Sequence, residues 1–138
     1  MTIVDASVAV KWFVPEAGDA GAQRLLESGE NLIGPFLIRV EVAAALARKA
    51  RLNEIERGDA KAAAKLWIQS IRDGVIILVS EDRDLSRAFD LAIELNHPLQ
   101  DCVYLALAER LGATLLTADR KFLAKARPSH PAIQGLAY

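Results

Sequence analysis

The sequence is poor in the residues that build disulfide-linked, zinc-binding or membrane-spanning proteins. It has one cysteine, Cys102, and two histidines among 138 residues, so it can form no intrachain disulfide and offers no zinc-ligand spacing. The N-terminal residues carry an early acid and no basic segment, which argues against a signal peptide. No apolar stretch has the length of a membrane span. We therefore expect a cytoplasmic protein that has no membrane partner.

An excess of charge of one sign is also lacking. Seventeen Lys and Arg residues nearly balance 18 Asp and Glu residues, which leaves a formal net charge of −1. This balance excludes an overall basic coat for duplex nucleic acid, but it allows a local basic patch. Hydrophobic residues make up 52% of the chain, which is enough for a core and is not typical of a disordered chain. The length suits one domain, residues 1–138.

Short apolar runs alternate with segments of helical periodicity along the chain. Pro35 is expected to open a helix that runs to about residue 50, Asn53 to cap the next helix and Gly74 to end it. The five apolar residues at 75–79 are typical of a strand that is covered on both faces. The alternation predicts an α/β fold with a mainly parallel sheet flanked by helices. Strands are expected at 3–4, 31–34, 75–79, 114–117 and 133–136.

Two acids follow predicted strands directly. Asp5 comes after the strand at 3–4, and Asp119 lies one residue past the strand at 114–117. Ligands of an open parallel sheet bind beyond the carboxyl ends of its strands. Either acid by itself could simply cap the next helix. Their shared position at one edge of the sheet favours a site.

Two further acids lie on predicted helices. Glu41 interrupts an otherwise almost wholly apolar run from residue 36 to residue 46, and charged residues are rarely buried unless they are paired or bind metal. A salt bridge to Arg39 or Lys11, or exposure on the polar side of the helix, would also explain this residue. Asp101 lies in the first turn after a proline, where the helix dipole alone would favour it.

Together the four acids form an oxygen-rich set. Carboxylates in one pocket repel each other, and a divalent cation removes that repulsion. Oxygen ligands without His or Cys pairs select Mg²⁺ or Mn²⁺ over Zn²⁺. Such sites hydrolyse phosphodiesters, because the metal activates water and neutralises charge on phosphorus.

The segments that contain these acids resemble a known family. They are residues 4–12 (VDASVAVKW), 40–42 (VEV), 101–108 (DCVYLALA) and 111–122 (LGATLLTADRKF). In this order they resemble the four acidic segments of PIN-domain proteins, especially the VapC-like toxins of toxin–antitoxin modules. The match covers nearly the whole chain, and the last two segments together are its most specific part.

The resemblance implies a fold, an activity and partners. It implies a PIN-like parallel sheet flanked by helices and a Mg²⁺- or Mn²⁺-dependent endoribonuclease. It also implies a homodimer, and the toxin role in a type II module that a cognate antitoxin inhibits. Ser7 and Thr117 match hydroxyl positions that support the acids, although bonding to the local backbone would explain them almost as well. The catalytic and metal-binding residues that it implies are Asp5, Glu41, Asp101 and Asp119.

Several basic and aromatic residues admit two interpretations. Four basic residues flank the acids in sequence and could hold RNA phosphates, although basic side chains on a surface are commonly just solvated. They are Lys11, Arg39, Arg120 and Lys121. Apolar residues around Trp12 and Leu46 are expected to provide surface for a homodimer and an antitoxin segment.

The two histidines, His97 and His130, have no partner in sequence that would make either one a base or a ligand.

Two other functions are compatible with an α/β fold. A Mg²⁺-dependent phosphatase or phosphotransferase would use an aspartate nucleophile, but Asp5-Ala6-Ser7 lacks the second aspartate that such enzymes place two residues on. A PIN-like domain with an inert site could serve only in binding, and the intact set of acids argues against such decay. No glycine-rich phosphate loop occurs in the sequence.

Overall fold

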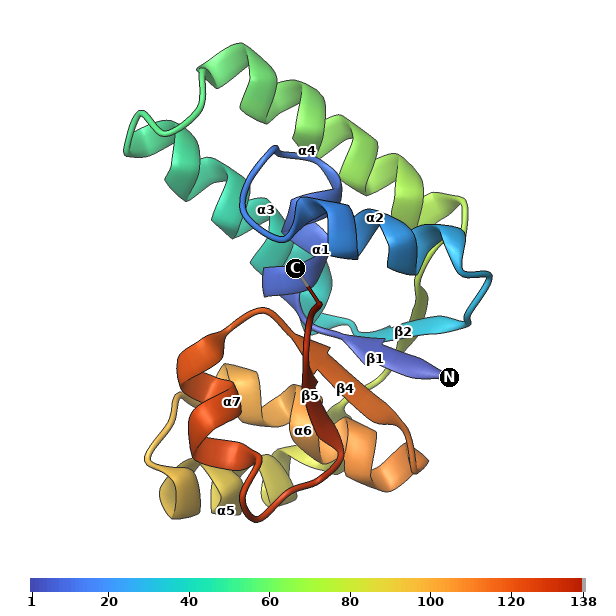
Figure 1. The fold of residues 1–138 in the computed structure, drawn as a ribbon, viewed down its shortest axis with the longest axis vertical. Helices are drawn as coiled ribbons and strands as arrows, with labels where there is room; N and C mark the ends of the chain where they lie inside the picture. The colour runs from blue at the N-terminus through green and yellow to red at the C-terminus, as the bar shows by residue number, and fades with distance from the viewer. Residues whose placement is uncertain (138) are drawn as a thin grey trace.

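The structure is a computed structural model that describes residues 1–137 and shows an α/β fold (Figure 1). Its elements in chain order are β1 (Thr2–Val4), α1 (Ala6–Ala9), a 3-10 turn (Val10–Trp12), α2 (Asp19–Glu27), β2 (Leu32–Pro35), α3 (Leu37–Arg51), α4 (Arg57–Arg72), β3 (Ile77–Val79), a 3-10 turn (Asp82–Asp84), α5 (Leu85–Leu95), α6 (Leu99–Leu111), β4 (Thr114–Thr117), α7 (Arg120–Ala126) and β5 (Ile133–Gly135). The strands form one five-stranded sheet in the order β3-β2-β1-β4-β5, and every neighbouring pair is parallel. The predicted fold class is confirmed.

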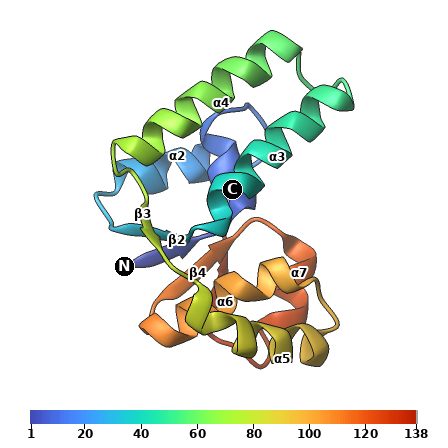
Figure 2. The ribbon, with the colours of Figure 1, turned by 180° about the vertical axis from the view of Figure 1, so that it is seen from behind.

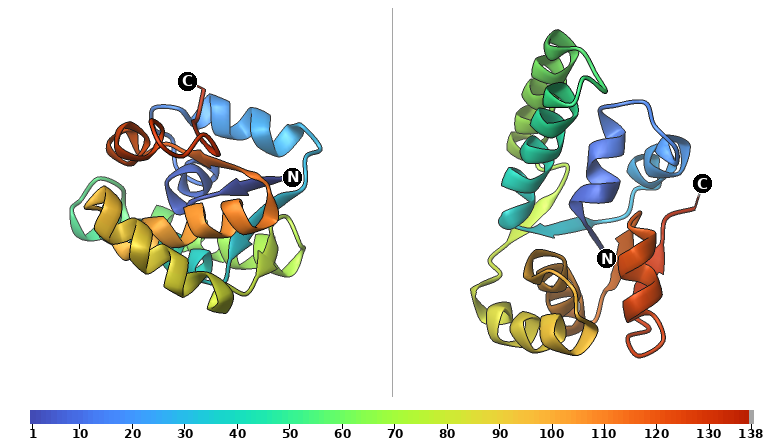
Figure 3. Two further views of the ribbon diagram at one scale, coloured as in Figure 1. Left: turned by 90° about the horizontal axis from the view of Figure 1, so that it is seen from below. Right: turned by 90° about the vertical axis from the view of Figure 1, so that its left-hand side faces the viewer.

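The first strand of the chain is the centre of the sheet. Ile3 of β1 lies opposite Ile33 of β2 and Leu115 of β4, and Ile3 and Leu115 are fully buried. Helix α6 packs on β1, β2 and β4, and α5 packs on α6. Figure 3 shows α5 and α6 on one side of β1 and β4, with α2 and α7 on the other side. Because β1 is enclosed by strands and helices, the residue that follows it is held rigidly.

Helices α3 and α4 form a hairpin that projects away from α5 and α6 (Figures 1 and 2). The prediction that Asn53 caps the second helix is wrong. Asn53 has a positive φ of 58° in the turn after α3, and Glu56 is the residue that precedes α4. Asparagine tolerates this left-handed conformation, so it serves the turn. Gly74 follows the end of α4 with φ of 72°, as predicted.

The apolar run at 75–79 forms a shorter and more exposed strand than its composition predicted. Only Ile77–Val79 are extended, and β3 is an edge strand that pairs with β2 alone. Ile77 is 48% exposed, so the expectation of a strand covered on both faces is wrong. Pro35 likewise ends β2 and does not open the next helix. A strand at the edge of a sheet has a neighbouring strand on one side only and is less covered by helices. Apolar composition does not reveal that a strand will take this position.

The C-terminal residues extend the edge of the sheet and pack against α2. The amide of Leu136 donates to the carbonyl of Thr117 at 2.8 Å, which extends the pairing of β4 and β5. A Cβ atom on Gly21 of α2 would lie 1.7 Å from the carbonyl oxygen of Ala137. Glycine is therefore needed at position 21 for the tail to pack here. Among residues 1–137, no helix has the length and apolar character to cross a bilayer.

Candidate active site

The carboxyl ends of β1 and β4 bring the first two acids together. Val4 pairs with Leu116, so the two strands end side by side, with Asp5 and Asp119 just beyond. Both acids also cap the helix that follows. Asp5 accepts from the amide of Val8 at 3.2 Å, and Asp119 precedes α7 in an extended conformation. The cap and site interpretations of these residues therefore both apply.

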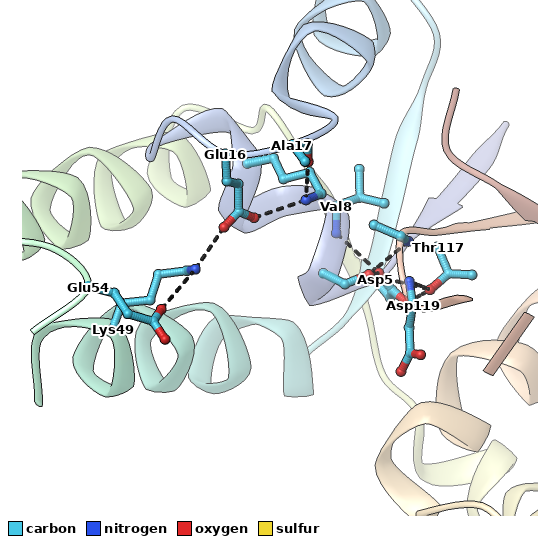
Figure 4. A network of polar contacts seen from close by, with 11 residues as sticks. Asp5, Val8, Glu16, Ala17, Lys49, Glu54, Thr117 and Asp119 are labelled. Carbon is cyan, nitrogen blue, oxygen red and sulfur yellow. Dashed lines mark hydrogen bonds and ion pairs between the residues drawn. The ribbon is translucent and has the colours of Figure 1, made fainter. Parts of the chain in front are cut away.

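Asp5 is a buried carboxylate held by hydroxyl groups (Figure 4). It is 4% exposed, and Ser7 and Thr117 donate short hydrogen bonds to its two carboxylate oxygens. The Ser7 hydroxyl also accepts from the amide of Ala118 at 2.9 Å, which links α1 to the end of β4. The pKa of Asp5 is raised to about 6, mainly by burial; the two hydroxyl donors offset part of the rise, and the nearby charge of Asp101 adds to it.

Glu41 enters the same region from α3 and is bound by a residue of α6. The hydroxyl of Tyr104, whose ring is fully buried, donates to Glu41 Oε1 at 2.6 Å. Burial raises the pKa of Glu41, and the charge of Asp101 adds to the rise. Burial and the charge of Glu41 also raise the pKa of Tyr104, so this hydroxyl remains a donor. The sequence did not single out Tyr104, which lies in the interior of an apolar helix.

Asp101 is the acid whose charge reaches the other three. It lies in the first turn of α6, and its charge raises the pKa of both Asp5 and Glu41. Burial raises its own pKa, with a contribution from the charge of Asp119. The structure thus brings Asp5, Glu41 and Asp119 within electrostatic range of Asp101. Uncompensated charges of one sign in such a place call for a counter-cation.

The prediction that the histidines have no partners is wrong. His97 is 9% exposed, and its Nε2 lies 2.6 Å from Asp101 Oδ2. Side-chain atoms of His97, Asp101 and Asp119 lie within 4.8 Å of one another, a spacing that could hold a metal ion. The i, i+4 spacing of His97 and Asp101 was a signal in the sequence, but the intervening Pro98 suggested a break there. His130 lies elsewhere, between Glu94 and Glu109.

The four basic residues that could hold RNA phosphates differ in how exposed their side chains are. Lys11 donates to Glu16 at 3.0 Å and to the carbonyl of Ala17 at 2.6 Å, and its side chain is 9% exposed. The same Glu16 carboxylate also accepts from Lys49 of α3 at 2.7 Å (Figure 4), so the two lysines share one acid. Three others remain exposed at the ends of α3 and α7. They are Arg39, Arg120 and Lys121.

The apolar residues expected to form a partner surface are mostly internal. Leu46 is 1% exposed, and the indole of Trp12 packs against the core and donates to the carbonyl of Ala22 at 2.9 Å. These two side chains themselves therefore offer little exposed apolar surface. Other apolar side chains are exposed instead, among them Phe89 at 59% and Ile93 at 68% on α5.

The chain matches the model of one protein family. The PIN domain model aligns with residues 2–128, which is most of the chain. The chain belongs to the PIN-domain family. Ribonuclease VapC3 of Pyrobaculum aerophilum is 31% identical to this PIN domain over 126 residues, which is 89% of this chain and 92% of that protein.

Two solved structures share the fold of this PIN domain. The crystal structure of PAE2754 from Pyrobaculum aerophilum is 25% identical and covers 98% of this chain and 88% of its own, with a TM-score of 0.72. A toxin–antitoxin complex from Klebsiella pneumoniae is 17% identical and covers 97% of this chain and 96% of its own, with a TM-score of 0.63. The second likeness shows the fold alone.

Proposed function

We propose that residues 1–138 form one PIN-like domain that acts as a divalent-metal-dependent endoribonuclease. The observation that carries this proposal is the convergence of Asp5, Glu41, Asp101 and Asp119 at the carboxyl edge of the sheet. Burial raises the pKa values of Asp5, Glu41 and Asp101, and the charge of a neighbouring acid adds to each rise. The relationship to Ribonuclease VapC3 supplies the substrate class, RNA.

The donor set fits Mg²⁺ or Mn²⁺, which prefer carboxylate oxygens. Asp101 and Asp119 would hold the ion, with Asp5 and Glu41 completing the anionic site directly or through water. When bound, the ion would activate water and neutralise charge on the scissile phosphate. The protein's own residues hold two of the carboxylates in place, because Asp5 and Glu41 each accept a hydrogen bond from a hydroxyl group of another element. These donors are Ser7 and Thr117 on Asp5 and Tyr104 on Glu41.

Exposed basic side chains near the acids would hold the RNA backbone. Arg39 on α3 and Arg120 and Lys121 on α7 are exposed, and phosphate contacts of this kind position a nucleic acid without reading its sequence. Lys11 has a structural role in this proposal, because Glu16 and Ala17 already bind its ammonium group. Its expected effect on RNA cleavage is therefore indirect.

We further propose the toxin role in a type II module, with a cognate antitoxin as inhibitor. A groove of about 390 Å³ between α3 and α4 is lined by alanines and Leu46, with Arg57 and Lys61 beside them. An antitoxin segment with apolar and acidic residues would suit this lining.

A homodimer remains part of the proposal. The exposed residues Leu85, Phe89 and Ile93 recur every four residues along α5, and Phe89→Glu should reduce a dimer to monomer in light scattering.

The phosphatase alternative is disfavoured by the surroundings of Asp5. A nucleophilic carboxylate needs a free oxygen that faces the substrate. Both oxygens of Asp5 accept hydrogen bonds, and the residue is 4% exposed. The carboxylate is therefore placed to organise the site and not to attack phosphorus. A domain that served only in binding would have no use for four acids whose charges repel each other.

RNA cleavage tests the proposal directly. The purified protein should cleave single-stranded RNA in Mg²⁺ or Mn²⁺, and EDTA should stop it. Asp101→Asn should abolish cleavage, whereas Asp90→Asn, a matched change at an exposed acid of α5, should not. Attack by water should leave 5′-phosphate and 3′-hydroxyl ends. Cleavage that persists in EDTA, or a 2′,3′-cyclic phosphate product, would contradict the metal-dependent hydrolysis.

A further inference from the structure

His97 lies in the corner between α5 and α6, next to the acids but outside the predicted set. It follows Asn96, whose left-handed φ of 49° ends α5. The imidazole is buried, and its Nε2 lies 2.6 Å from Asp101 Oδ2. One ring nitrogen therefore faces a carboxylate at hydrogen-bond distance. Which nitrogen carries the proton decides what this ring can do.

Asp101 of α6 and Lys125 of α7 favour the same tautomer of His97. The ammonium group of Lys125 donates to the carbonyl of Asn96 at 2.6 Å and lies 3.4 Å from His97 Nδ1. An ammonium group is only a donor, so Nδ1 faces it as an acceptor. The proton of the neutral ring is then on Nε2, where it donates to Asp101. In this arrangement neither ring nitrogen offers a free lone pair to a metal ion.

The plane of the imidazole is fixed by Phe122. The two rings are stacked with centroids 4.6 Å apart and an interplanar angle of 11°, and Phe122 is fully buried. The amide of Phe122 also donates to Asp119 Oδ1 at 3.1 Å. The same residue thus contacts the ring that holds Asp101 and the carboxylate of Asp119. His97 and Phe122 together set the relative positions of these two acids.

We propose that His97 is a positioning residue for the metal site and not a metal ligand, with Asp101 and Lys125 together fixing its tautomer. This inference rests on the proposed function in that it assigns the cation to Asp101 and Asp119. The Nε2–H group holds Asp101 Oδ2 and leaves the other oxygen available to the cation. The donor set stays all oxygen, which keeps the selectivity for hard cations such as Mg²⁺ and Mn²⁺.

Calorimetric titration of the RNA-free protein with Mn²⁺ tests the role of the ring. His97→Leu removes the donor, and Mn²⁺ affinity should fall roughly tenfold or more, as is typical when a partner of a ligand is lost. His97→Gln retains an N–H donor and should stay within about threefold of wild type, a margin well inside that loss. If the imidazole were a ligand, both variants would lose affinity equally, which would overturn the proposal.

Lys125→Met distinguishes the effect of Lys125 on the tautomer of His97 from the effect of its positive charge on cation binding. Removing a nearby positive charge should by itself strengthen cation binding. Loss of the ammonium group beside Nδ1 should weaken it, because Asp101 alone then keeps the proton on Nε2. We expect weaker Mn²⁺ binding in the wild-type background and no weakening in the His97→Gln background, where no tautomer exists. Stronger binding in both backgrounds would overturn the assignment to Lys125.

His130 provides the matched control. It is also buried, at 7% exposed, and also bound by carboxylates, those of Glu94 and Glu109. His130→Leu should change the melting temperature in EDTA but not the affinity for Mn²⁺. If His97→Leu behaves like this control, the role of His97 is structural only and the proposal fails. A wild-type protein that binds Mn²⁺ but cleaves no RNA would refute the proposed function and leave the test of His97 intact.

Discussion

Replacing Asp5 with asparagine tests whether a buried, ionised carboxylate at this position destabilises the metal-free protein. Burial raises the pKa of Asp5 from its ordinary value of 3.8 to about 6. Below pH 3.8 the carboxyl is protonated in the folded and unfolded states and costs nothing. As the pH rises through 6 the folded protein must ionise a buried group, and stability is lost. The shift corresponds to about 3 kcal/mol at pH 7.

Asparagine has the shape of the protonated carboxyl and no charge. It can still accept a hydrogen bond from one hydroxyl and donate to the other, because Ser7 and Thr117 are each able to do both. In EDTA, Asp5→Asn should match wild type near pH 4 and exceed it by up to about 3 kcal/mol at pH 7. Urea unfolding at several pH values measures this difference directly.

Excess Mg²⁺ should remove most of this difference in stability. A ligand at one hundred times its dissociation constant adds about 2.7 kcal/mol to the protein that binds it. The wild type should gain this stability, and Asp5→Asn should gain little. If Asp5→Asn is instead less stable in EDTA by the same amount at every pH, the carboxylate acts only as a helix cap. The argument that the buried charge of Asp5 destabilises the metal-free protein would then be refuted.

Three further substitutions test separate parts of the structure. Tyr104→Phe removes the hydrogen-bond donor to Glu41 and should destabilise the metal-free protein by about 2 kcal/mol in urea unfolding. It should also weaken Mn²⁺ binding, which calorimetry measures. Asp119→Ala should cost about 1 kcal/mol in EDTA through loss of the cap of α7 and should also shrink the rise in Tm on adding Mg²⁺; a full Mg²⁺ response would exclude Asp119 from the site. Gly21→Ala would place a Cβ 1.7 Å from the Ala137 carbonyl, so it should destabilise by about 1–3 kcal/mol. Gly58→Ala, where a Cβ meets nothing within 4 Å, should be neutral or stabilising, and equal effects at both glycines would contradict the close packing of the tail.

Local pattern in the sequence was sufficient for the fold class and for the position of the acids. Strands and helices alternate because apolar runs and helical periodicity alternate, and this leads to a parallel sheet. Asp5 and Asp119 follow strands, so the topology brings them to the same edge whatever the details of packing. Their helix-capping geometry could also be predicted, because it depends on residues two or three positions away.

What surrounds each acid was decided only by the tertiary structure. Tyr104 binds Glu41 across 63 residues, and Thr117 binds Asp5 across 112 residues. No local pattern encodes such pairs, because they depend on how α3, α6 and β4 pack together. The engagement of Lys11 by Glu16, the edge position of β3 and the partners of His97 have the same origin. The sequence by itself determined which groups carry charge and where the chain turns, whereas packing determined how deeply each charge is buried and which donor holds it.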